Sequence, residues 1–536
     1  MEKSITNKNC LLSCSCCGHS RRDFLVNCAK CLGAVGVFSG FADPTILAKE
    51  VYTPKAQIKV RVVFVLQAPI QTRADWPNIG FDFNPVMEEI MNALKIGCPG
   101  IEFIQSMAAR ANNAEEITNA DQAEGNIDGY LVVQMNTGPQ GVAQQFVSTG
   151  KPVLYADFLY GGSGRFLITT AYLLRDKAEN FAHMSSNNVA HLVAAANCFP
   201  LAKATGSVKA FVDGVTQIRK YIVAGVKVDM ECADDKFDIL STGDLLRELR
   251  TKKILEFEKG WADVGQQTKE LFGIEIIRRP FAELNGLWEK ADREQAMGIV
   301  KRWKSSAVAI VNVPDETLEK SARMYLAMKQ CLKDHGACAI TIDCLTAFYG
   351  GHVQAYPCLG FHELLNEGLI GACECDTLST LTMVIMTTLT KGRPGFISDP
   401  VMDVATKQII YAHCVASNKP FGPQGASNPY TIMTHSEDRQ GASLRSTLPS
   451  GYMTTTLEFD PRSKQILFHQ AKAVGNSTED RACRTKLVTV PTGDFEKLYT
   501  YWDNPWHWHR VTYYGDLKKP VFTLADTLGW KVVEEA

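Results

Sequence analysis

Lys-Val-Arg-Val-Val-Phe-Val-Leu, at residues 59–66, is the stretch that decides the fold class of this chain. A short apolar run rich in β-branched residues is typical of a parallel strand that is buried on both faces. A segment with helical spacing of apolar residues follows at 83–94, and two more strand-like runs lie at 128–136 and 151–157. This alternation of strand and helix predicts an α/β domain with a mostly parallel sheet over residues 43–206.

The same alternation returns in residues 207–342. Strand-like runs at 252–257, 306–313 and 337–342 are separated by stretches with helical spacing, of which 316–334 is one. This pattern predicts a second α/β domain with a parallel sheet.

The last part of the chain, residues 343–536, has a different character. It contains short runs in which apolar and polar residues alternate, such as 453–459, 464–469 and 486–490. Runs of this kind are typical of antiparallel strands in a barrel or a sandwich. The sequence therefore predicts two parallel-sheet domains, Rossmann- or flavodoxin-like, followed by a mixed α/β domain with an antiparallel β-barrel.

The composition of the 536 residues excludes several classes of protein. Apolar residues make up 46% and charged residues 21%, which is ordinary for a globular chain and unlike a disordered or coiled-coil protein. Lys and Arg number 56 against 58 for Asp and Glu, so there is no basic excess to indicate a nucleic-acid partner. The sequence has no apolar stretch of about 18 residues that would span a membrane.

Residues 1–42 have the features of a targeting segment. Ser-Arg-Arg-Asp-Phe-Leu at 20–25 resembles a twin-arginine export signal, and the Gly-rich apolar run after it is too short to span a bilayer. The small residues Gly40 and Ala42 suit a cut after residue 42. We therefore expect a periplasmic protein; the alternative is an ordinary basic N-terminal helix.

Cysteine is the over-represented residue, with seventeen in the chain. Six of them lie at positions 10, 14, 16, 17, 28 and 31, inside the expected export signal, and they complete no metal-ligand pattern. The other eleven are scattered, and a chain of this length can build its own hydrophobic core. We expect them to be free, buried thiols.

Candidate chemistry begins at Gly-Ala-Cys-Glu-Cys-Asp, residues 371–376. If this segment is a strand, Glu374 and Asp376 point to the same face, because alternate side chains share a face. Two such carboxylates repel unless a cation, an arginine or a shared proton lies between them. The alternative is that Asp376 caps the following helix and Glu374 is solvated. The spacing alone does not decide between these two interpretations.

A second candidate is Trp-His-Trp-His at 506–509. In a strand, His507 and His509 would share one face and could bind a metal ion or line a pocket. The alternative is an aromatic lid packed on the core. His362, Glu363 and His413 are further candidates, each weak by itself.

Several of these motifs, taken in order, resemble the carboxyl half of the L-fucose isomerase and L-arabinose isomerase group. The resemblance begins at the acidic motif 372–376 and the helix after it, and continues through Pro-x-Phe-x-x-Asp at 394–399. His-Cys at 413–414 and His509 with Tyr-Gly-Asp at 514–516 complete it. The segments before residue 343 fit the two leading α/β domains of that group.

The resemblance implies an enzyme that interconverts an aldose and a ketose through an ene-diol, with Mn²⁺ held by two carboxylates and one histidine. Carried over by position, Asp376 and His509 are expected metal ligands, and Glu363 or His362 falls near the position of the other carboxylate, with Glu363 the expected ligand. Glu374 and Asp376 are the expected catalytic residues. Oxygen ligands with an imidazole suit a hard divalent ion.

For the substrate, the resemblance implies a free sugar or sugar derivative. We expect His413, His507 and Trp508 to contact it; the Trp-rich segment is unusual for the group, but tryptophan faces suit stacking on a sugar ring. It also implies a homo-oligomer, a trimer or a hexamer. Two alternatives stay open. One is the same metal site used for another reaction on a glycoside or modified sugar, and the other is a non-catalytic periplasmic sugar-binding protein.

Overall fold

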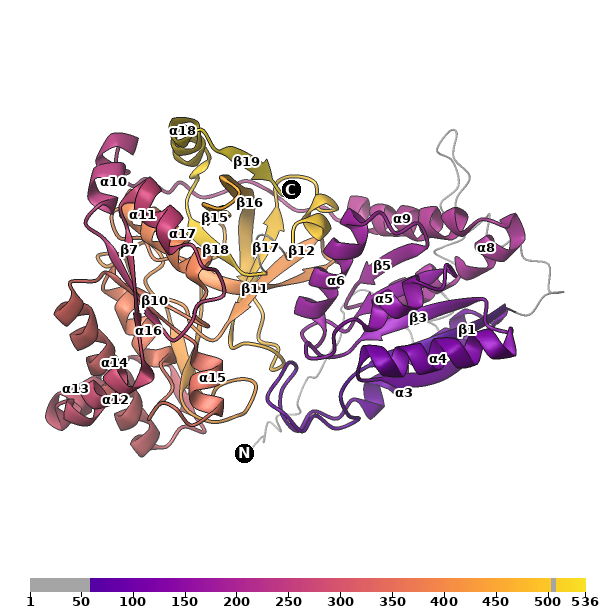
Figure 1. Ribbon diagram of the computed structural model, residues 1–536, viewed down its shortest axis with the longest axis horizontal. Coiled ribbons are helices and arrows are strands. Elements are labelled where there is room, and N and C mark those ends of the chain that lie inside the picture. The colour runs from indigo at the N-terminus through magenta and orange to yellow at the C-terminus, as the bar shows by residue number, and fades with distance from the viewer. Residues whose placement is uncertain (1–57, 503–507) are drawn as a thin grey trace, which may run out of the picture. The chain divides into compact units, whose positions relative to one another are not determined.

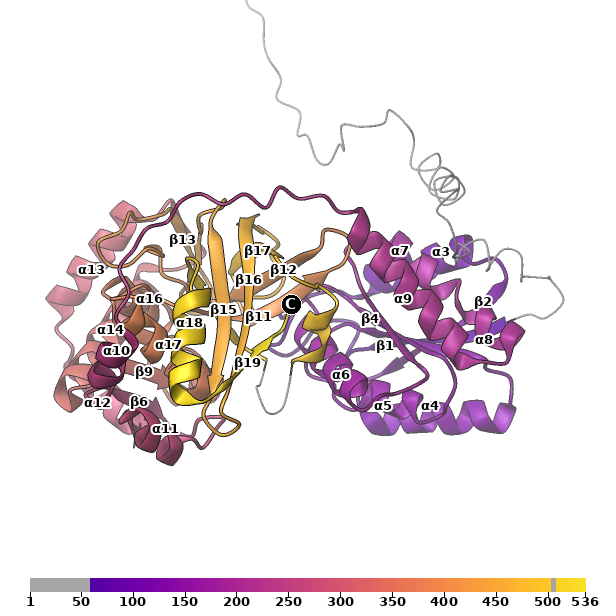
Figure 2. The same ribbon diagram turned by 90° about the horizontal axis from the view of Figure 1, so that it is seen from above.

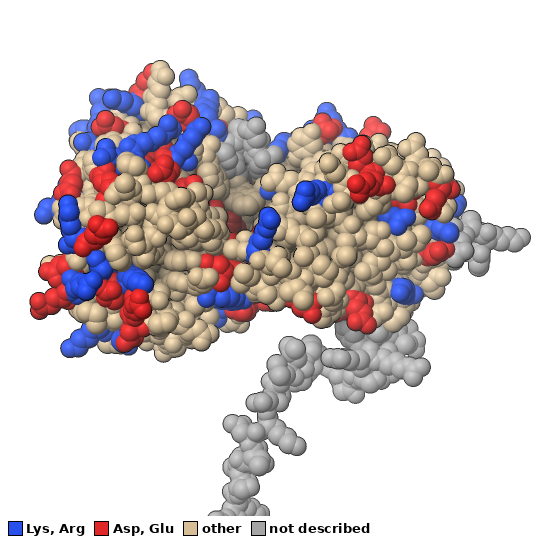
Figure 3. Space-filling view, turned by 60° about the horizontal axis from the view of Figure 1, so that its bottom comes forward, with Lys and Arg blue, Asp and Glu red and all other residues tan. Residues whose placement is uncertain are grey.

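The computed structural model describes residues 58–502 and 508–536 (Figure 1). The expected export signal and His507 lie outside the described residues. Within them, no helix combines the length and the apolar character needed to cross a membrane. Basic and acidic side chains are interspersed on the face in Figure 3, which is hollowed near its middle.

The first domain is built on a five-stranded parallel sheet with the strand order β2-β1-β3-β4-β5. Strand β1, which lies between β2 and β3, contains most of the run at 59–66, and Val60, Val62 and Phe64 are buried there. The strands are β1 (Ile58–Val65), β2 (Ile101–Ala108), β3 (Gly129–Gln134), β4 (Val153–Asp157) and β5 (Phe181–Ser185).

Helices cover both faces of this sheet, as Figure 2 shows. One layer contains α3 (Asn84–Gly97), α7 (Val189–Ala196) and α9 (Val208–Gly225), with α8 (Phe199–Thr205) packed on α9. The other contains α4 (Ala111–Glu124), α5 (Val142–Val147) and α6 (Ser163–Arg175). Two covered faces explain why the inner strands β3 and β4 are buried at every residue.

The second parallel sheet has the order β10-β9-β6-β7. Its strands are β6 (Lys253–Phe257), β7 (Glu275–Arg279), β9 (Ala339–Ile342) and β10 (Ile370–Ala372). The sheet thus takes β10 from beyond the expected boundary at residue 343, because β10 pairs in parallel with β9. The run expected as a strand at 306–313 is β8 (Ala309–Val311), which pairs with β13 (Tyr430–Met433) and not with this sheet.

The helices of this part include α14 (Asp315–His335), which confirms the expected helix at 316–334. They also include α10 (Thr242–Leu249), α11 (Gly265–Phe272), α12 (Phe281–Lys290), α13 (Arg293–Ser306), α15 (Cys344–Tyr349), α16 (Cys358–Asn366) and α17 (Thr377–Leu389). Helix α17 is almost wholly buried between the second sheet and the barrel strands.

The predicted antiparallel β-barrel is present. Six strands in the order β15-β18-β11-β12-β17-β16 close through a pairing of β15 with β16. They are β11 (Phe396–Asp403), β12 (Gln408–His413), β15 (Met453–Asp460), β16 (Gln465–Asn476), β17 (Thr485–Pro491) and β18 (Arg510–Tyr514). The strand β19 (Lys531–Glu534) adds to β16 in parallel, β14 (Ser443–Ser446) pairs with β13, and α18 (Lys518–Leu528) precedes β19. The predicted fold class is therefore confirmed.

A buried ion pair fixes strand β18 to the chain end. Arg510 donates from Nη2 (2.7 Å) and Nε (3.0 Å) to Oε1 of Glu535, and both side chains are inaccessible to solvent. His469 lies 3.0 Å from Oε2 of the same carboxylate. Burial raises the pKa of Glu535, but Arg510 and His469 outweigh it, so the pKa is lowered overall.

We predict that Glu535→Ala lowers the free energy of unfolding by about 3–5 kcal/mol, because it leaves Arg510 buried without its partner. The matched control is Glu534→Ala, which removes a half-exposed partner of Lys518 and should cost about 0–1 kcal/mol. Denaturant titration measures both. Because the pKa of Glu535 is depressed, its contribution to stability should be present above the ordinary glutamate pKa of 4.5 and fall away at lower pH. Equal losses for the two variants would contradict this account.

Candidate metal centre

Four side chains converge at one end of the barrel: Glu374, Asp399, His413 and His509. Asp399 lies in β11, His413 ends β12, and His509 directly precedes β18. These three strands are neighbours in the barrel, and the pairing of Ser398 with Arg510 brings Asp399 opposite His509. Strand register therefore assembles three of the four residues.

The distances between the polar atoms are short. His509 Nε2 lies 3.1 Å from Asp399 Oδ1 and 3.8 Å from Glu374 Oε2. His413 Nε2 lies 3.4 Å from Glu374 Oε1 and 3.9 Å from Asp399 Oδ2. Glu374, His413 and His509 each offer a ligand atom within 4.8 Å of the others, so one ion could contact all three.

Glu374 reaches this point through an unusual turn. Strand β10 ends at Ala372, and Glu374 and Cys375 have positive φ angles of 61° and 51°. Two successive non-glycine residues in this region cost on the order of 1–3 kcal/mol each. The expected extended segment with Glu374 and Asp376 on one face is thus replaced by a turn that separates their directions.

Asp376 lies behind His509 and not at the expected ligand position. Its carboxylate caps helix α17 by accepting from Ser379 N at 3.1 Å and from Ser379 Oγ at 2.9 Å. Its Oδ2 also lies 3.0 Å from His509 Nδ1. With Nδ1 bound in this way, Nε2 of His509 faces Glu374 and Asp399, as metal-binding histidines require. The helix-cap interpretation and a positioning role both apply to Asp376.

Glu363, the expected second carboxylate ligand, is placed elsewhere. It lies in α16, where it accepts from Arg302 Nη2 at 2.8 Å and from Trp303 Nε1 at 2.6 Å. It lines a separate cavity of 540 Å³ that contains none of the four converging residues. Asp399 instead brings a second carboxylate to the cluster, 3.1 Å from His509 Nε2. The signal for Asp399 was already in the sequence, in the motif at 394–399.

The electrostatics of the cluster favour a cation. Burial lowers the pKa of His509, but Asp399, Asp376 and Glu374 outweigh it and raise the pKa well above its usual value. Burial likewise raises the pKa of Glu374, but His413 and His509 outweigh it and lower the pKa. The negative field that stabilises a charged imidazole would equally attract a divalent ion.

Unsatisfied nitrogens show that the residues fit such an ion. Both ring nitrogens of His413 and Nε2 of His509 are buried and make no well-aligned hydrogen bond within the described residues, although the two Nε2 atoms lie 3.1–3.9 Å from carboxylate oxygens. Buried polar atoms without partners are rare in folded proteins. Carboxylate oxygens combined with imidazole nitrogens suit Mn²⁺ and similar divalent ions. We conclude that the cluster of Glu374, Asp399, His413 and His509 could hold a metal ion.

A cavity of 350 Å³ opens onto this centre. Glu374 and Asp399 lie in its wall, and so does Trp508, one of the residues expected to contact substrate. His413 is 2% exposed and contacts Glu374, so it reaches the cavity through that residue. A larger cavity of 820 Å³ lies along β4 and β5 and contains none of the four converging residues.

A second metal-competent cluster, Glu283, Cys331 and His335, is less suited to catalysis. Glu283 is already bound by His335 at 2.7 Å and by Arg279. Burial raises the pKa of Cys331 to about 12, so the sulfur is held as a thiol and not as the thiolate that metals prefer.

The fold and this cluster define an α/β protein whose barrel carries, at one end, histidine and carboxylate side chains that could hold a metal ion. No protein-family model matches the chain. Its relatives include the sulfoquinovose isomerase of Priestia aryabhattai, 22% identical over 292 residues, which are 53% of this chain and 64% of that protein. The sulfoquinovose isomerase of Clostridium sp. (strain MSTE9) is 26% identical over 257 residues, 46% of this chain and 56% of that protein.

The alignments span less than two thirds of these curated relatives. The chain is therefore a distant relative of sugar isomerases. Among solved structures, a carbohydrate transporter from Acidothermus cellulolyticus 11B in complex with myo-inositol is 13% identical over 63% of this chain and 90% of its own. Its TM-score of 0.17 is too low to support any argument.

We predict a graded loss of Mn²⁺ affinity in three variants measured by calorimetry. Glu374→Gln and His509→Gln remove ligands and should lose the most. Asp376→Asn leaves the ligands in place but loosens His509, so the loss should be roughly 10–100-fold. Glu363→Gln is the matched control and should bind Mn²⁺ like the unaltered protein. A strong loss in Glu363→Gln with none in Glu374→Gln would contradict this assignment.

Proposed function

We propose that this protein is a divalent-metal-dependent isomerase that interconverts the aldose and ketose forms of a free sugar. The observation that carries the proposal is the convergence of Glu374, Asp399 and His509, with unsatisfied ring nitrogens, on a cavity. The distant relationship to proteins named sulfoquinovose isomerase supports the same reaction class. Mn²⁺ is the ion we propose, because the ligand set combines hard oxygens with imidazole.

The bound ion would polarise the carbonyl of the sugar and offset the charge that develops on its oxygen. The protein's own residues have the remaining tasks. Glu374 is ionised, since its pKa is lowered, and it lies in the cavity wall. We assign to its carboxylate the removal of the proton at C2 and its return at C1, through an ene-diol, while the proton of the C2 hydroxyl moves to the C1 oxygen.

His413 and Asp376 act on this centre through other residues. The imidazole of His413, 3.4 Å from Glu374, can hold the carboxylate in a fixed orientation while it transfers the proton. Asp376, which was expected to be catalytic, is 1% exposed and acts by positioning His509. Binding a sugar alone does not require an ionised Glu374 with a strained backbone beside the buried nitrogens of His413 and His509. We therefore favour an enzyme over a sugar-binding protein.

We predict that the Mn²⁺-loaded protein exchanges the C2 proton of at least one aldose with solvent. Incubation of pentoses and hexoses in D₂O, followed by NMR, measures this exchange and the ketose formed. Glu374→Gln should lower kcat by roughly 10²–10⁴-fold, the usual contribution of a general base. Glu363→Gln should retain activity. Mn²⁺ binding without exchange in any aldose would favour another reaction at the same site.

We also propose that residues 1–42 direct export by the twin-arginine route, on the evidence of the motif at 20–25 alone. In a bacterial host, the unaltered chain should appear in the periplasmic fraction. Replacing Arg21 and Arg22 together by lysine should retain the full-length chain in the cytoplasm. Export that is unaffected by this double change would contradict the proposal.

A further inference from the structure

We infer that Glu437 and Asp75 bind hydroxyl groups of the substrate from the wall of the 350 Å³ cavity, and that the substrate is an uncharged sugar. This inference rests on the proposed function, because it concerns the same cavity. It goes further in naming two residues that determine which sugar is accepted.

The cavity is lined by residues of the first α/β domain and by residues from the second sheet and the barrel. Glu374 and Asp399 come from the metal centre, and Trp508 lies beside them. Asp75 belongs to the loop after β1, and Glu437 to the loop after β13. A volume of 350 Å³ is near the lower end of the roughly 300–1,000 Å³ typical of ligand pockets, which suits a monosaccharide.

Glu437 is suited to contact hydroxyl groups. Its Oε2 accepts from the hydroxyl of Tyr349 at 2.6 Å, and Tyr349 also lines the cavity. Burial, with Asp75 and Glu374 nearby, raises the pKa of Glu437 to about 8. The carboxyl group is therefore largely protonated at neutral pH, so it can both donate and accept a hydrogen bond, as a sugar hydroxyl does.

Asp75 is held rigidly in the wall. It accepts from Trp76 N and Gly138 N, each at 2.8 Å, and from the hydroxyl of Thr137. The loops after β1 and β3 carry these residues, and the strand order β2-β1-β3 makes this edge the switch point of the sheet. Ligands of open α/β sheets bind at such a point, outside the carboxyl ends of the strands.

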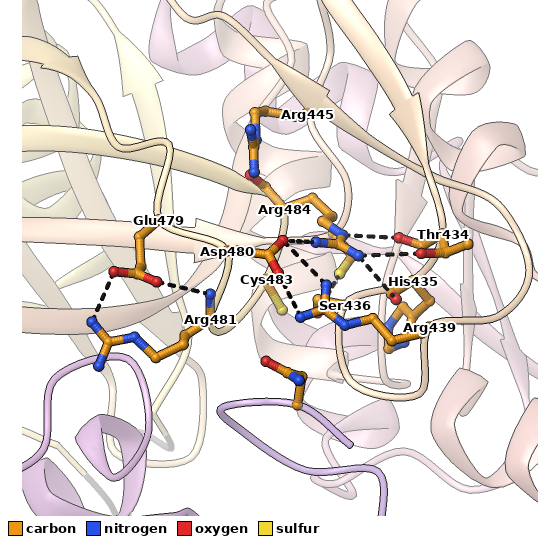
Figure 4. A network of polar contacts seen from close by, with 12 residues as sticks. Thr434, His435, Ser436, Arg439, Arg445, Glu479, Asp480, Arg481, Cys483 and Arg484 are labelled. Atoms are coloured by element: carbon orange, nitrogen blue, oxygen red, sulfur yellow. Dashed lines mark hydrogen bonds and ion pairs between the residues drawn. The ribbon is translucent and has the colours of Figure 1, made fainter. Parts of the chain in front are cut away.

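The loop that carries Glu437 is clamped by the network in Figure 4. Arg484 donates from Nε to the carbonyl oxygen of Thr434 at 2.9 Å. Asp480 accepts hydrogen bonds from Arg484 Nη1 at 2.7 Å and from Arg439 Nη2 at 2.8 Å. Since Arg484 binds Thr434 at the start of the loop and Arg439 lies at its other end, Asp480 connects the two ends. Glu437 is therefore presented in a fixed position and not on a loose loop.

A second set of contacts joins this loop to its surroundings. The backbone N–H of Ile79 donates to the carbonyl oxygen of Glu437 at 2.7 Å, which connects it to the loop that holds Asp75. Tyr356 donates to the carboxylate of Asp438. The loop that carries Asp75 and the loop that carries Glu437 are thus joined by one short backbone hydrogen bond.

The charges of the wall argue against an anionic substrate. Four of the described residues that line the cavity have carboxyl side chains. The described lining contains no lysine or arginine. A sulfonate or phosphate placed there, away from the proposed metal ion, would lose its hydration without gaining a basic side chain from the lining, which is costly. Arg165 lies outside that lining, where its Nε donates to the carbonyl oxygen of Thr137 at 3.2 Å. The inferred substrate therefore differs from sulfoquinovose, the sulfonated sugar in the relatives' name.

The test compares binding of two ligands to the full Mn²⁺-loaded protein by calorimetry. One is the alditol of the aldose that shows C2 exchange, and the other is the same alditol with a terminal sulfonate. The unaltered protein should bind the neutral alditol about tenfold or more tightly. Glu437→Gln and Asp75→Asn should each weaken that binding about tenfold, while Mn²⁺ affinity stays unchanged.

Tyr349→Phe is the milder variant, because it removes only the hydroxyl that holds Glu437. It should weaken neutral-alditol binding severalfold, and Glu363→Gln, in the other cavity, should not. Preferred binding of the sulfonate, lost in Arg165→Gln, would overturn the inference and assign anion binding to Arg165. Alditol binding that ignores Glu437→Gln, Asp75→Asn and Tyr349→Phe would overturn this inference alone, whereas an unaltered protein that binds no Mn²⁺ would overturn the proposed function.

Discussion

The hydrogen bond between Asp376 and His509 joins segments that lie 133 residues apart in the sequence. The same carboxylate caps α17, so one side chain fixes both the start of that helix and the ring of the histidine. Helix α17 follows the last strand of the second parallel sheet, and His509 precedes a barrel strand. The candidate metal centre therefore depends on the buried carboxylate of Asp376, whose hydrogen bonds connect the start of helix α17 with His509 at the barrel. Burying it is tolerated because several donors surround it.

The turn at Glu374 and Cys375 is the second constraint. A left-handed turn of two non-glycine residues persists only where the surroundings hold it, and here Cys375 N donates to Ile342 O at 2.9 Å. Because of this turn, the side chain of Glu374 lies against His413, and the side chain of Asp376 caps helix α17. Behind them lies Glu458, whose pKa burial raises well above normal, with Asp376 adding to the effect. This concentration of carboxyl groups around two histidines is the arrangement that a divalent ion would stabilise.

Regular patterns made most of the fold predictable from the sequence. Apolar runs gave the strands of the first sheet, and alternation gave the barrel, because burial on one or both faces leaves a direct trace in the residue order. Long-range pairing leaves no such trace. The placement of β8 beside β13, and of β10 in the second sheet, follows from contacts between distant segments. The expected boundary at residue 343 was drawn from local patterns, which do not indicate that β10 pairs with β9 across it.

The candidate site was predictable only in part, for a related reason. His509 and Glu374 stood in recognisable motifs, and the structure brings them together. The shared face expected for Glu374 and Asp376 assumed extended backbone, and the positive φ angles remove that assumption. Glu437 and Asp75 carry no motif at all, since they reach the cavity from loops after β13 and β1. If the barrel and the turn after β10 supply the ligands and the loops after β1 and β13 supply substrate recognition, then substitutions in those loops can change the accepted sugar without disturbing the metal. Such a division would let distant relatives share a reaction class and differ in substrate.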